Sequence, residues 1–147
     1  MVIGIIGESC TGKSTIADAL KEKLDATVYT GKGYIRFAKN ESDAKRAFAS
    51  MLKENTGSDK IIVYLITERP ELAFLPDDAV RVLITADIEV IKERFRLRMD
   101  GILPAPISAM LERKHGMFDN ERYDIHLISS VRSCDENIQA VMKYLGK

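Results

Sequence analysis

Eight consecutive residues early in the chain have the types and spacing of a phosphate-binding loop. Residues 7–14 read Gly-Glu-Ser-Cys-Thr-Gly-Lys-Ser and match G-x-x-x-x-G-K-[ST] at every fixed position. In such a loop the backbone N–H groups surround a polyphosphate, and glycine permits a tight turn and a close backbone approach. We therefore expect the following residues to bind the phosphates of Mg·ATP: Gly7, Glu8, Ser9, Cys10, Thr11, Gly12, Lys13 and Ser14.

Within this loop, the side chains indicate different tasks. Lys13 is expected to reach the β and γ phosphates, and the Ser14 hydroxyl is expected to ligate Mg²⁺. The start of the following helix adds N–H donors and the positive end of a dipole. Thr15 either contacts the α phosphate or is a plain first-turn residue. The alternative for the whole motif is a glycine-rich turn without a ligand, but an apolar strand before it and an amphipathic helix after it favour nucleotide.

A second group of candidates is basic and lies later in the chain. Arg94 and Arg98 are four residues apart on an expected helix and therefore share a face, and Arg113 follows in the next helix. Guanidinium groups grip phosphate oxygens bidentately and stabilise the charge that moves during phosphoryl transfer. The alternative is a solvated basic face paired with neighbouring glutamates. The phosphate loop favours a phosphate role for Arg94 and Arg98, and leaves both readings open for Arg113.

Strand and helix patterns alternate from one end of the chain to the other. The apolar runs predict strands at residues 2–6, 27–29, 61–66, 80–85 and 125–128, with 61–66 central. Helices are expected at about 13–24, 41–55, 87–99 and 106–117, and a last helix opens with a capping box at Ser133 and Glu136. This alternation predicts a single α/β domain over residues 1–147, with a parallel sheet covered on both faces.

Composition limits the classes of partner. The 22 basic and 22 acidic residues give a formal net charge of zero, so bulk electrostatic binding to nucleic acid or to a membrane surface is not expected. No apolar run approaches the length of a membrane span. The two cysteines, Cys10 and Cys134, do not form a disulfide framework. We expect a cytoplasmic protein, and its oligomeric state is left open.

Three segments resemble the small P-loop kinases, a group that includes nucleoside monophosphate kinases, cytidylate kinases and shikimate kinase. They are GESCTGKST after the first strand, RFRLR after the fourth and YDIHLIS at the fifth. The resemblance implies a three-layer fold with a five-stranded parallel sheet in the order 2-3-1-4-5. It also implies a lid at about residues 98–118, with Arg94 and Arg98 at its start and Arg113 on its far side. The turn that ends at Arg132 would border the adenine.

The chain departs from the family pattern both before and after its third strand. The segment between strands two and three is short, which implies a small acceptor-binding region. The family usually places an aspartate near the end of strand three for the Mg²⁺ hydration shell, whereas this chain has Thr67-Glu68-Arg69. Glu68 would then serve the metal and Arg69 an acceptor phosphate. The equal alternative is that both residues form an ordinary exposed turn.

The chain also lacks the aspartate that hydroxyl-phosphorylating kinases commonly carry after strand two, since residues 29–36 contain no acid. An ionised phosphate acceptor needs cations instead of a base. Lys32 and Arg36 provide cations in this segment, and Tyr34 could stack on a base. The pattern favours a nucleoside monophosphate or another phosphorylated acceptor, although a Gly-Lys-Gly segment is more often only a loop.

Together these residues predict an enzyme that transfers the γ-phosphoryl group of Mg·ATP to a small acceptor. A nucleotide-dependent switch or regulatory ATPase without a small-molecule acceptor is the alternative, and a degenerate domain retained for assembly is a weaker one. His115 and His126 have no partner spacing for a metal site or a catalytic triad, and His126, within a strand, is expected to be a packed or edge histidine.

Overall fold

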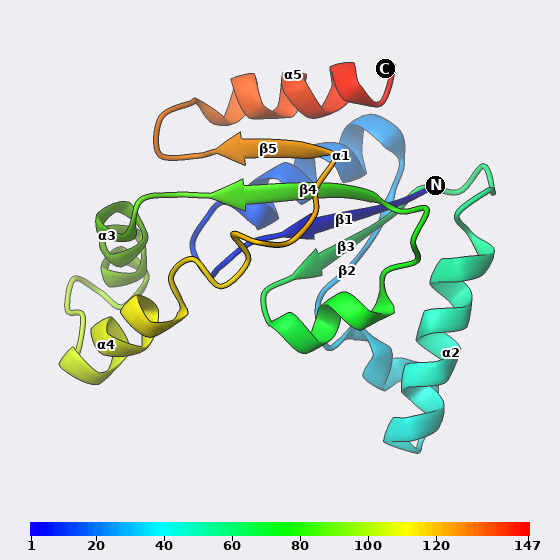
Figure 1. Ribbon diagram of the computed structural model, residues 1–147, viewed down its shortest axis with the longest axis horizontal. Helices are drawn as coiled ribbons and strands as arrows, with labels where there is room; N and C mark the ends of the chain where they lie inside the picture. The colour runs from blue at the N-terminus through cyan, green and yellow to red at the C-terminus, as the bar shows by residue number, and fades with distance from the viewer.

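Five parallel strands form one sheet in the computed structural model, which describes residues 1–147 (Figure 1). They are β1 (Val2–Ile6), β2 (Thr27–Tyr29), β3 (Ile62–Ile66), β4 (Val80–Thr85) and β5 (Ile125–Ile128). Their order is β2-β3-β1-β4-β5, which confirms the predicted topology. The middle position belongs to β1, and β3, which we expected to be central, lies beside it. Both strands are buried along their whole length.

Helices cover both faces of the sheet, so the fold has three layers (Figure 1). On one face lie α1 (Lys13–Leu24) and α5 (Cys134–Tyr144). The other face is covered by α2 (Glu41–Glu54) and by the 3₁₀ helix η2 (Arg69–Phe74), and a second 3₁₀ helix, η1 (Gly33–Phe37), follows β2. Beyond the carboxyl ends of the strands lie α3 (Ile88–Arg98) and α4 (Ala105–Lys114).

The alternation of side chains along β1 divides the core between the two faces. Ile3 and Ile5 pack in the cluster that includes Ile16 of α1. Val2 and Ile6 belong instead to the cluster on the α2 face, which includes Phe48. The short apolar run therefore fills two layers at once, which explains why it contains no polar residue.

Side-chain caps begin α2 and α5 at the residues that the sequence predicts. The Asn40 side chain accepts a hydrogen bond from Asp43 N (3.2 Å) and caps α2. At α5, the Ser133 hydroxyl accepts from Glu136 N (3.1 Å), and the Glu136 carboxylate accepts from Ser133 N (3.2 Å). These bonds satisfy N–H groups that the first turn of a helix leaves unpaired.

An aromatic cluster around Phe48 holds the α2 face together. Phe48 is fully buried, and its ring centroid lies 5.0 Å from that of Tyr64 and 5.3 Å from those of Phe37 and Phe74. Tyr29 lies 5.6 Å away. Because these rings come from β2, β3, η1 and η2, Phe48 joins four elements to α2.

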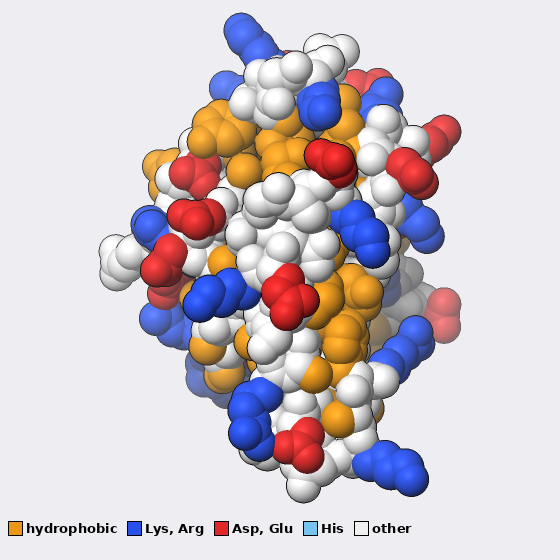
Figure 2. Space-filling view, turned by 90° about the vertical axis from the view of Figure 1, so that its right-hand side faces the viewer, with side chains coloured by type: hydrophobic (Ala, Val, Ile, Leu, Met, Phe, Trp, Pro, Cys, Tyr) orange, Lys and Arg blue, Asp and Glu red, His pale blue; other side chains and the backbone are white.

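The surface at the amino-terminal ends of the strands shows no concentration of one charge. In Figure 2, which views this side, basic and acidic side chains are interspersed, and hydrophobic atoms appear in separate places between them. None of the helices combines the length and the hydropathy needed to span a lipid bilayer.

We predict that Phe48→Ala lowers the free energy of unfolding by about 3–5 kcal/mol, because it removes a large buried ring and leaves a cavity. Urea denaturation followed by circular dichroism measures the change. Ile35→Ala in η1 is the control, since Ile35 is 59% exposed and its truncation should change stability by no more than about 0.5 kcal/mol. A loss at Phe48 no larger than that of the control would contradict the packing described above.

Candidate active site

The loop between β1 and α1 has a backbone that only particular residues can form. A Cβ on Gly7 would lie 2.7 Å from the Ile84 carbonyl oxygen and 2.7 Å from Thr11 Oγ1, so a side chain does not fit there. Gly12 has φ of +99°, in the region that favours glycine. Cys10 also has a positive φ, 63°. Left-handed residues within a turn are typical of loops whose N–H groups form a concave anion site.

Lys13 lies inside this loop and is only 8% exposed. Its Nζ donates to the Glu8 carbonyl oxygen at 2.7 Å, and Thr11 Oγ1 donates to the same oxygen at 2.8 Å. Burial lowers the pKa of Lys13 to about 8; the charge of Arg98 acts in the same direction, and those of Cys10 and Glu71 oppose it. A poorly hydrated ammonium group gains more than a surface lysine does from an approaching anion.

A cavity of about 210 Å³, the loop cavity, opens beside Lys13. It is lined by Ser9, Cys10, Gly12, Lys13, Ser14, Thr15, Thr30, Gly31, Leu65, Thr67 and Arg98. The phosphate loop thus faces the ends of β2 and β3 across this cavity. The exposed Ser14 hydroxyl lies where an ion could reach it.

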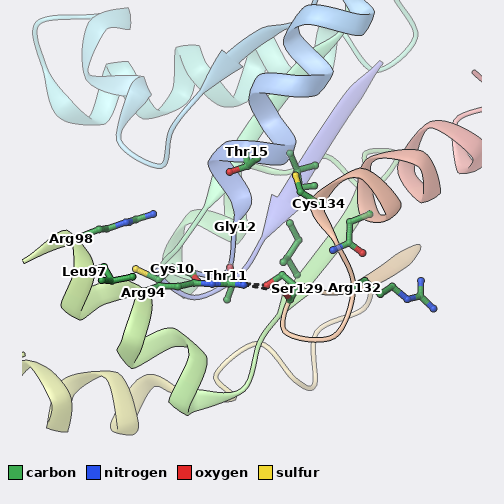
Figure 3. Close-up of a pocket in the computed structure, with 13 residues that line it drawn as sticks. Cys10, Thr11, Gly12, Thr15, Arg94, Leu97, Arg98, Ser129, Arg132 and Cys134 are labelled. Carbon is green, nitrogen blue, oxygen red and sulfur yellow. Dashed lines mark hydrogen bonds between the residues drawn. The ribbon is translucent and has the colours of Figure 1, made fainter. Parts of the chain in front are cut away.

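A second cavity of about 410 Å³, the α5 cavity, adjoins the other side of the phosphate loop (Figure 3). Its lining is Cys10, Thr11, Gly12, Thr15, Ile16, Ile84, Arg94, Leu97, Arg98, Ser129, Arg132, Cys134 and Asn137. Cys10, Gly12, Thr15 and Arg98 line both cavities, so a single elongated ligand could occupy both.

Arg94 joins the phosphate loop to the turn after β5. Its guanidinium donates to the Cys10 carbonyl oxygen, to Ser129 Oγ and to the Ser129 carbonyl oxygen, each at 3.0 Å. Figure 3 shows this side chain reaching from α3 to Ser129, with Arg98 separate from it. The Arg98 side chain, which lines both cavities, makes no hydrogen bond or ion pair within the protein, and its charge is available to a ligand.

The remaining predicted cations, Arg113 and Arg132, do not line the loop cavity. Arg113 is exposed on α4, lines none of the described cavities and makes no ion pair. Arg132 is exposed, and the α5 cavity is the only one of the two that it lines. Within the predicted lid, Leu111 of α4 packs with Cys10 and Ile91, so the helix rests against the phosphate loop.

Glu8 connects the phosphate loop to the end of α4. Its buried carboxylate lies 3.0 Å from His115 Nδ1 and accepts from Gly116 N at 3.0 Å. The sequence carried no signal of this contact, because 107 residues separate Glu8 from His115. His115, for which the sequence indicated no role, thus contacts the phosphate loop directly.

Glu68 and Arg69, the predicted metal and acceptor residues after β3, are both engaged in ion pairs with other side chains. Glu68 pairs with Lys114 at 2.6 Å, and Arg69 donates to the Met117 carbonyl oxygen at 2.6 Å and pairs with Glu121. Neither residue lines the loop cavity. The structure thus uses both side chains to attach the turn after β3 to the segment that follows α3.

Glu71, which the sequence reasoning missed, lies closer to the centre of the site. One carboxylate oxygen accepts from Thr67 N and Glu68 N at 2.9 Å. The other contacts Gly31 so closely that a Cβ there would be 1.9 Å from it. No acid occurs in residues 29–36, yet the fold places this one against the end of β2. The capping-box spacing of Glu68 and Glu71 was the only sequence signal for it.

A third cavity of about 510 Å³, the α2 cavity, lies between α2 and the two 3₁₀ helices. Its lining is Lys32, Tyr34, Lys45, Arg46, Ala49, Glu68, Pro70, Glu71, Ala73 and Phe74. Lys32 and Tyr34 were predicted acceptor residues; Arg36 and Arg69, also predicted, do not line it. Lys45 and Arg46 are cations that the sequence did not single out, because their helical pattern resembled a solvated surface.

Tyr34 and Lys45 form one side of this cavity. The Tyr34 ring lies 5.3 Å from that of Phe74, with an angle of 30° between the planes. Lys45 Nζ lies 5.7 Å from the centroid of the Tyr34 ring and 3.2 Å from Glu41. The cation and ring hold each other in place at the cavity wall.

Comparison with solved structures shows that the fold is that of the small P-loop kinases. An uncharacterized protein from Eubacterium ventriosum is similar over 100% of this chain and 99% of its own, with a TM-score of 0.75 and 17% identity. A shikimate kinase from Bacteroides thetaiotaomicron covers the same shares with a TM-score of 0.67 and 15% identity. YorR from Bacillus subtilis, solved with phosphorylated GDP, has a TM-score of 0.69 and 21% identity over 99% of this chain and 96% of its own. No protein-family model and no curated protein matches the sequence.

We predict that ADP affinity changes little near pH 7 and falls as the pH rises through the pKa of Lys13, about 8, approaching about tenfold per unit well above it. The reason is that free Lys13 is protonated below this pKa and loses its charge above it. Isothermal titration calorimetry measures the affinity. Lys13→Met should bind ADP more weakly and show no such decline. Wild-type affinity that stays level to pH 9.5 would contradict a lowered pKa.

Proposed function

We propose that this protein transfers the γ-phosphoryl group of Mg·ATP to a small anionic acceptor. The observation that carries the proposal is the buried Lys13 ammonium in a glycine-bounded loop, beside a cavity that continues toward α5. The similarity to small P-loop kinases supports it at the level of the fold.

The nucleotide fits the loop cavity with its phosphates and the α5 cavity with its base. Lys13, which now donates to the Glu8 carbonyl oxygen, would donate to phosphate oxygens instead. Ser14 would hold Mg²⁺, and Thr15 and Arg132 would border the nucleotide. When bound, Mg²⁺ supplies positive charge that neutralises the phosphate oxygens.

The two arginines of α3 take separate tasks in this proposal. Arg94 is held by three hydrogen bonds and keeps the two walls of the α5 cavity at a fixed separation. Arg98 has no partner in the protein, lies at the junction of the two cavities, and would stabilise charge on the transferred group. Arg113 is exposed and lines neither cavity, and we leave it out of the catalytic set.

The acceptor would bind in the α2 cavity, where Lys32, Lys45 and Arg46 provide positive charge. Glu71 also lines this cavity, and its free oxygen contacts Gly31, which lines the loop cavity. The carboxylate therefore lies between the proposed acceptor and the phosphates.

This position favours an acceptor hydroxyl at the inner end of the α2 cavity. A phosphate acceptor at this place, as in a nucleoside monophosphate, would be repelled by the Glu71 carboxylate. A phosphorylated compound with a hydroxyl group would direct its phosphate to the cations. Glu71 would take the hydroxyl proton while the oxygen attacks the γ-phosphorus and the bond to ADP breaks.

A nucleotide-dependent switch is the second candidate, favoured by the contact of Glu8 with His115 and Gly116. A phosphate in the loop could shift this contact and move α4. In a switch, ATP hydrolysis would be slow and unaffected by any acceptor, which separates the two functions.

We predict that Lys13→Ala reduces ADP release at least about 100-fold, because it removes a charge placed at the developing phosphate charge. A coupled assay with Mg·ATP measures turnover, and a circular-dichroism melt checks the fold. Lys21→Ala, at an exposed position of the same helix, is the matched control and should retain activity. Turnover of Lys13→Ala at the wild-type rate would refute the assignment.

We also predict that sugar phosphates or hydroxy acids stimulate ADP release more than AMP, CMP or UMP do. The panel should include ribose 5-phosphate, glucose 6-phosphate, shikimate and gluconate. With the best acceptor, Glu71→Gln should lower kcat about 10²–10⁴-fold and change the KM for ATP little. Glu54→Gln, an exposed change at the end of α2, is the control. Stimulation by nucleoside monophosphates alone, unchanged in Glu71→Gln, would contradict the role of Glu71.

A further inference from the structure

The only polar side chain of β3 is a fully buried tyrosine. Tyr64 lies among aliphatic residues of the strand, and its ring packs in the aromatic cluster around Phe48. Its hydroxyl donates to the Gly31 carbonyl oxygen at 2.8 Å, across 33 positions of the chain. Burial raises the pKa of Tyr64, and the charge of Glu71 acts in the same direction. The hydroxyl therefore keeps its proton and remains a donor.

Packing of the ring does not by itself explain the hydroxyl. A phenylalanine would fill nearly the same space, as Phe37 and Phe74 do in the same cluster. The hydroxyl instead binds the backbone at Gly31, which lies beyond Tyr29, the last paired residue of β2. Tyr64 therefore attaches to the sheet a segment that strand pairing no longer holds, and it satisfies a carbonyl oxygen there.

This segment passes between the two cavities in which the proposed phosphates and acceptor would lie. Thr30 and Gly31 line the loop cavity, and Lys32 lines the α2 cavity. The Glu71 carboxylate occupies the place that a side chain at position 31 would need, because a Cβ on Gly31 would lie 1.9 Å from Glu71 Oε2. Gly31 thus contacts the Tyr64 hydroxyl through its carbonyl oxygen and the Glu71 carboxylate through its bare α carbon.

We propose that Tyr64 is a positioning residue, whose hydroxyl holds Gly31 so that the Glu71 carboxylate keeps its place between the acceptor and the phosphates. This inference rests on the proposed function, in which Glu71 is the base. Backbone N–H groups already fix one carboxylate oxygen at 2.9 Å, and the other oxygen rests against Gly31. A base must lie within hydrogen-bond reach of its proton, and a displacement of about 1 Å can cost about 100-fold in rate. Tyr64 lines neither cavity and would act on kcat through Gly31.

The test is Tyr64→Phe, which keeps the buried ring and removes only the hydroxyl. With the best acceptor of the panel above, kcat should fall about tenfold, while the KM values for ATP and for the acceptor stay within about twofold. In the Glu71→Gln background the same substitution should change kcat less than about twofold, because no base remains to be positioned. Tyr29→Phe is the matched control: its ring packs on Phe48, its hydroxyl has no hydrogen-bond partner in the protein, and kcat should not change.

Wild-type kcat in Tyr64→Phe, or the same fold loss in the wild-type and Glu71→Gln backgrounds, would overturn the inference and leave the kinase assignment intact. If no acceptor stimulates the wild-type protein, the proposed function has failed, and urea denaturation then tests the arrangement alone. The shift in urea midpoint of the Tyr64→Phe/Glu71→Gln double variant should differ from the sum of the two single shifts, because both side chains contact Gly31. Additive shifts would show that Tyr64 does not hold the carboxylate.

Discussion

The burial of the Lys13 ammonium is the constraint on which the site depends. A charge removed from water must find fixed dipoles, and here it finds the Glu8 carbonyl oxygen in its own loop. The loop can fold in this way only because Gly7 has no side chain between the Ile84 carbonyl and Thr11. The pairing of β1 with β4 brings that carbonyl under the loop. Sheet geometry and the environment of the lysine are therefore linked.

Two polar contacts attach the phosphate loop to neighbouring segments of the fold. Arg94 ties the phosphate loop to Ser129 after β5, and Glu8 ties it to the end of α4. Both contacts are possible because parallel strands bring their carboxyl ends to one edge of the sheet, where all the loops meet. The phosphate loop is thus braced from two sides, and the two cavities beside it have defined walls.

Charged side chains give the proposed acceptor and phosphate regions different electrostatic character. Glu71 places negative charge between the α2 cavity and the loop cavity, whereas the cations that line the α2 cavity are Lys32, Lys45, which pairs with Glu41, and Arg46, which pairs with Asp43. The proposed donor and acceptor would therefore meet at Lys13 and Arg98.

The sequence by itself determined the strands, the helix caps and the phosphate loop, because each depends on residues within a few positions of one another. Alternating apolar runs predicted the parallel sheet, and the glycines with Lys13 predicted the anion site. Only the tertiary structure decided that Glu71 lies against Gly31 and that His115 contacts Glu8. These contacts join residues distant in the chain, and their geometry depends on how loops at one sheet edge pack together, which no local pattern encodes.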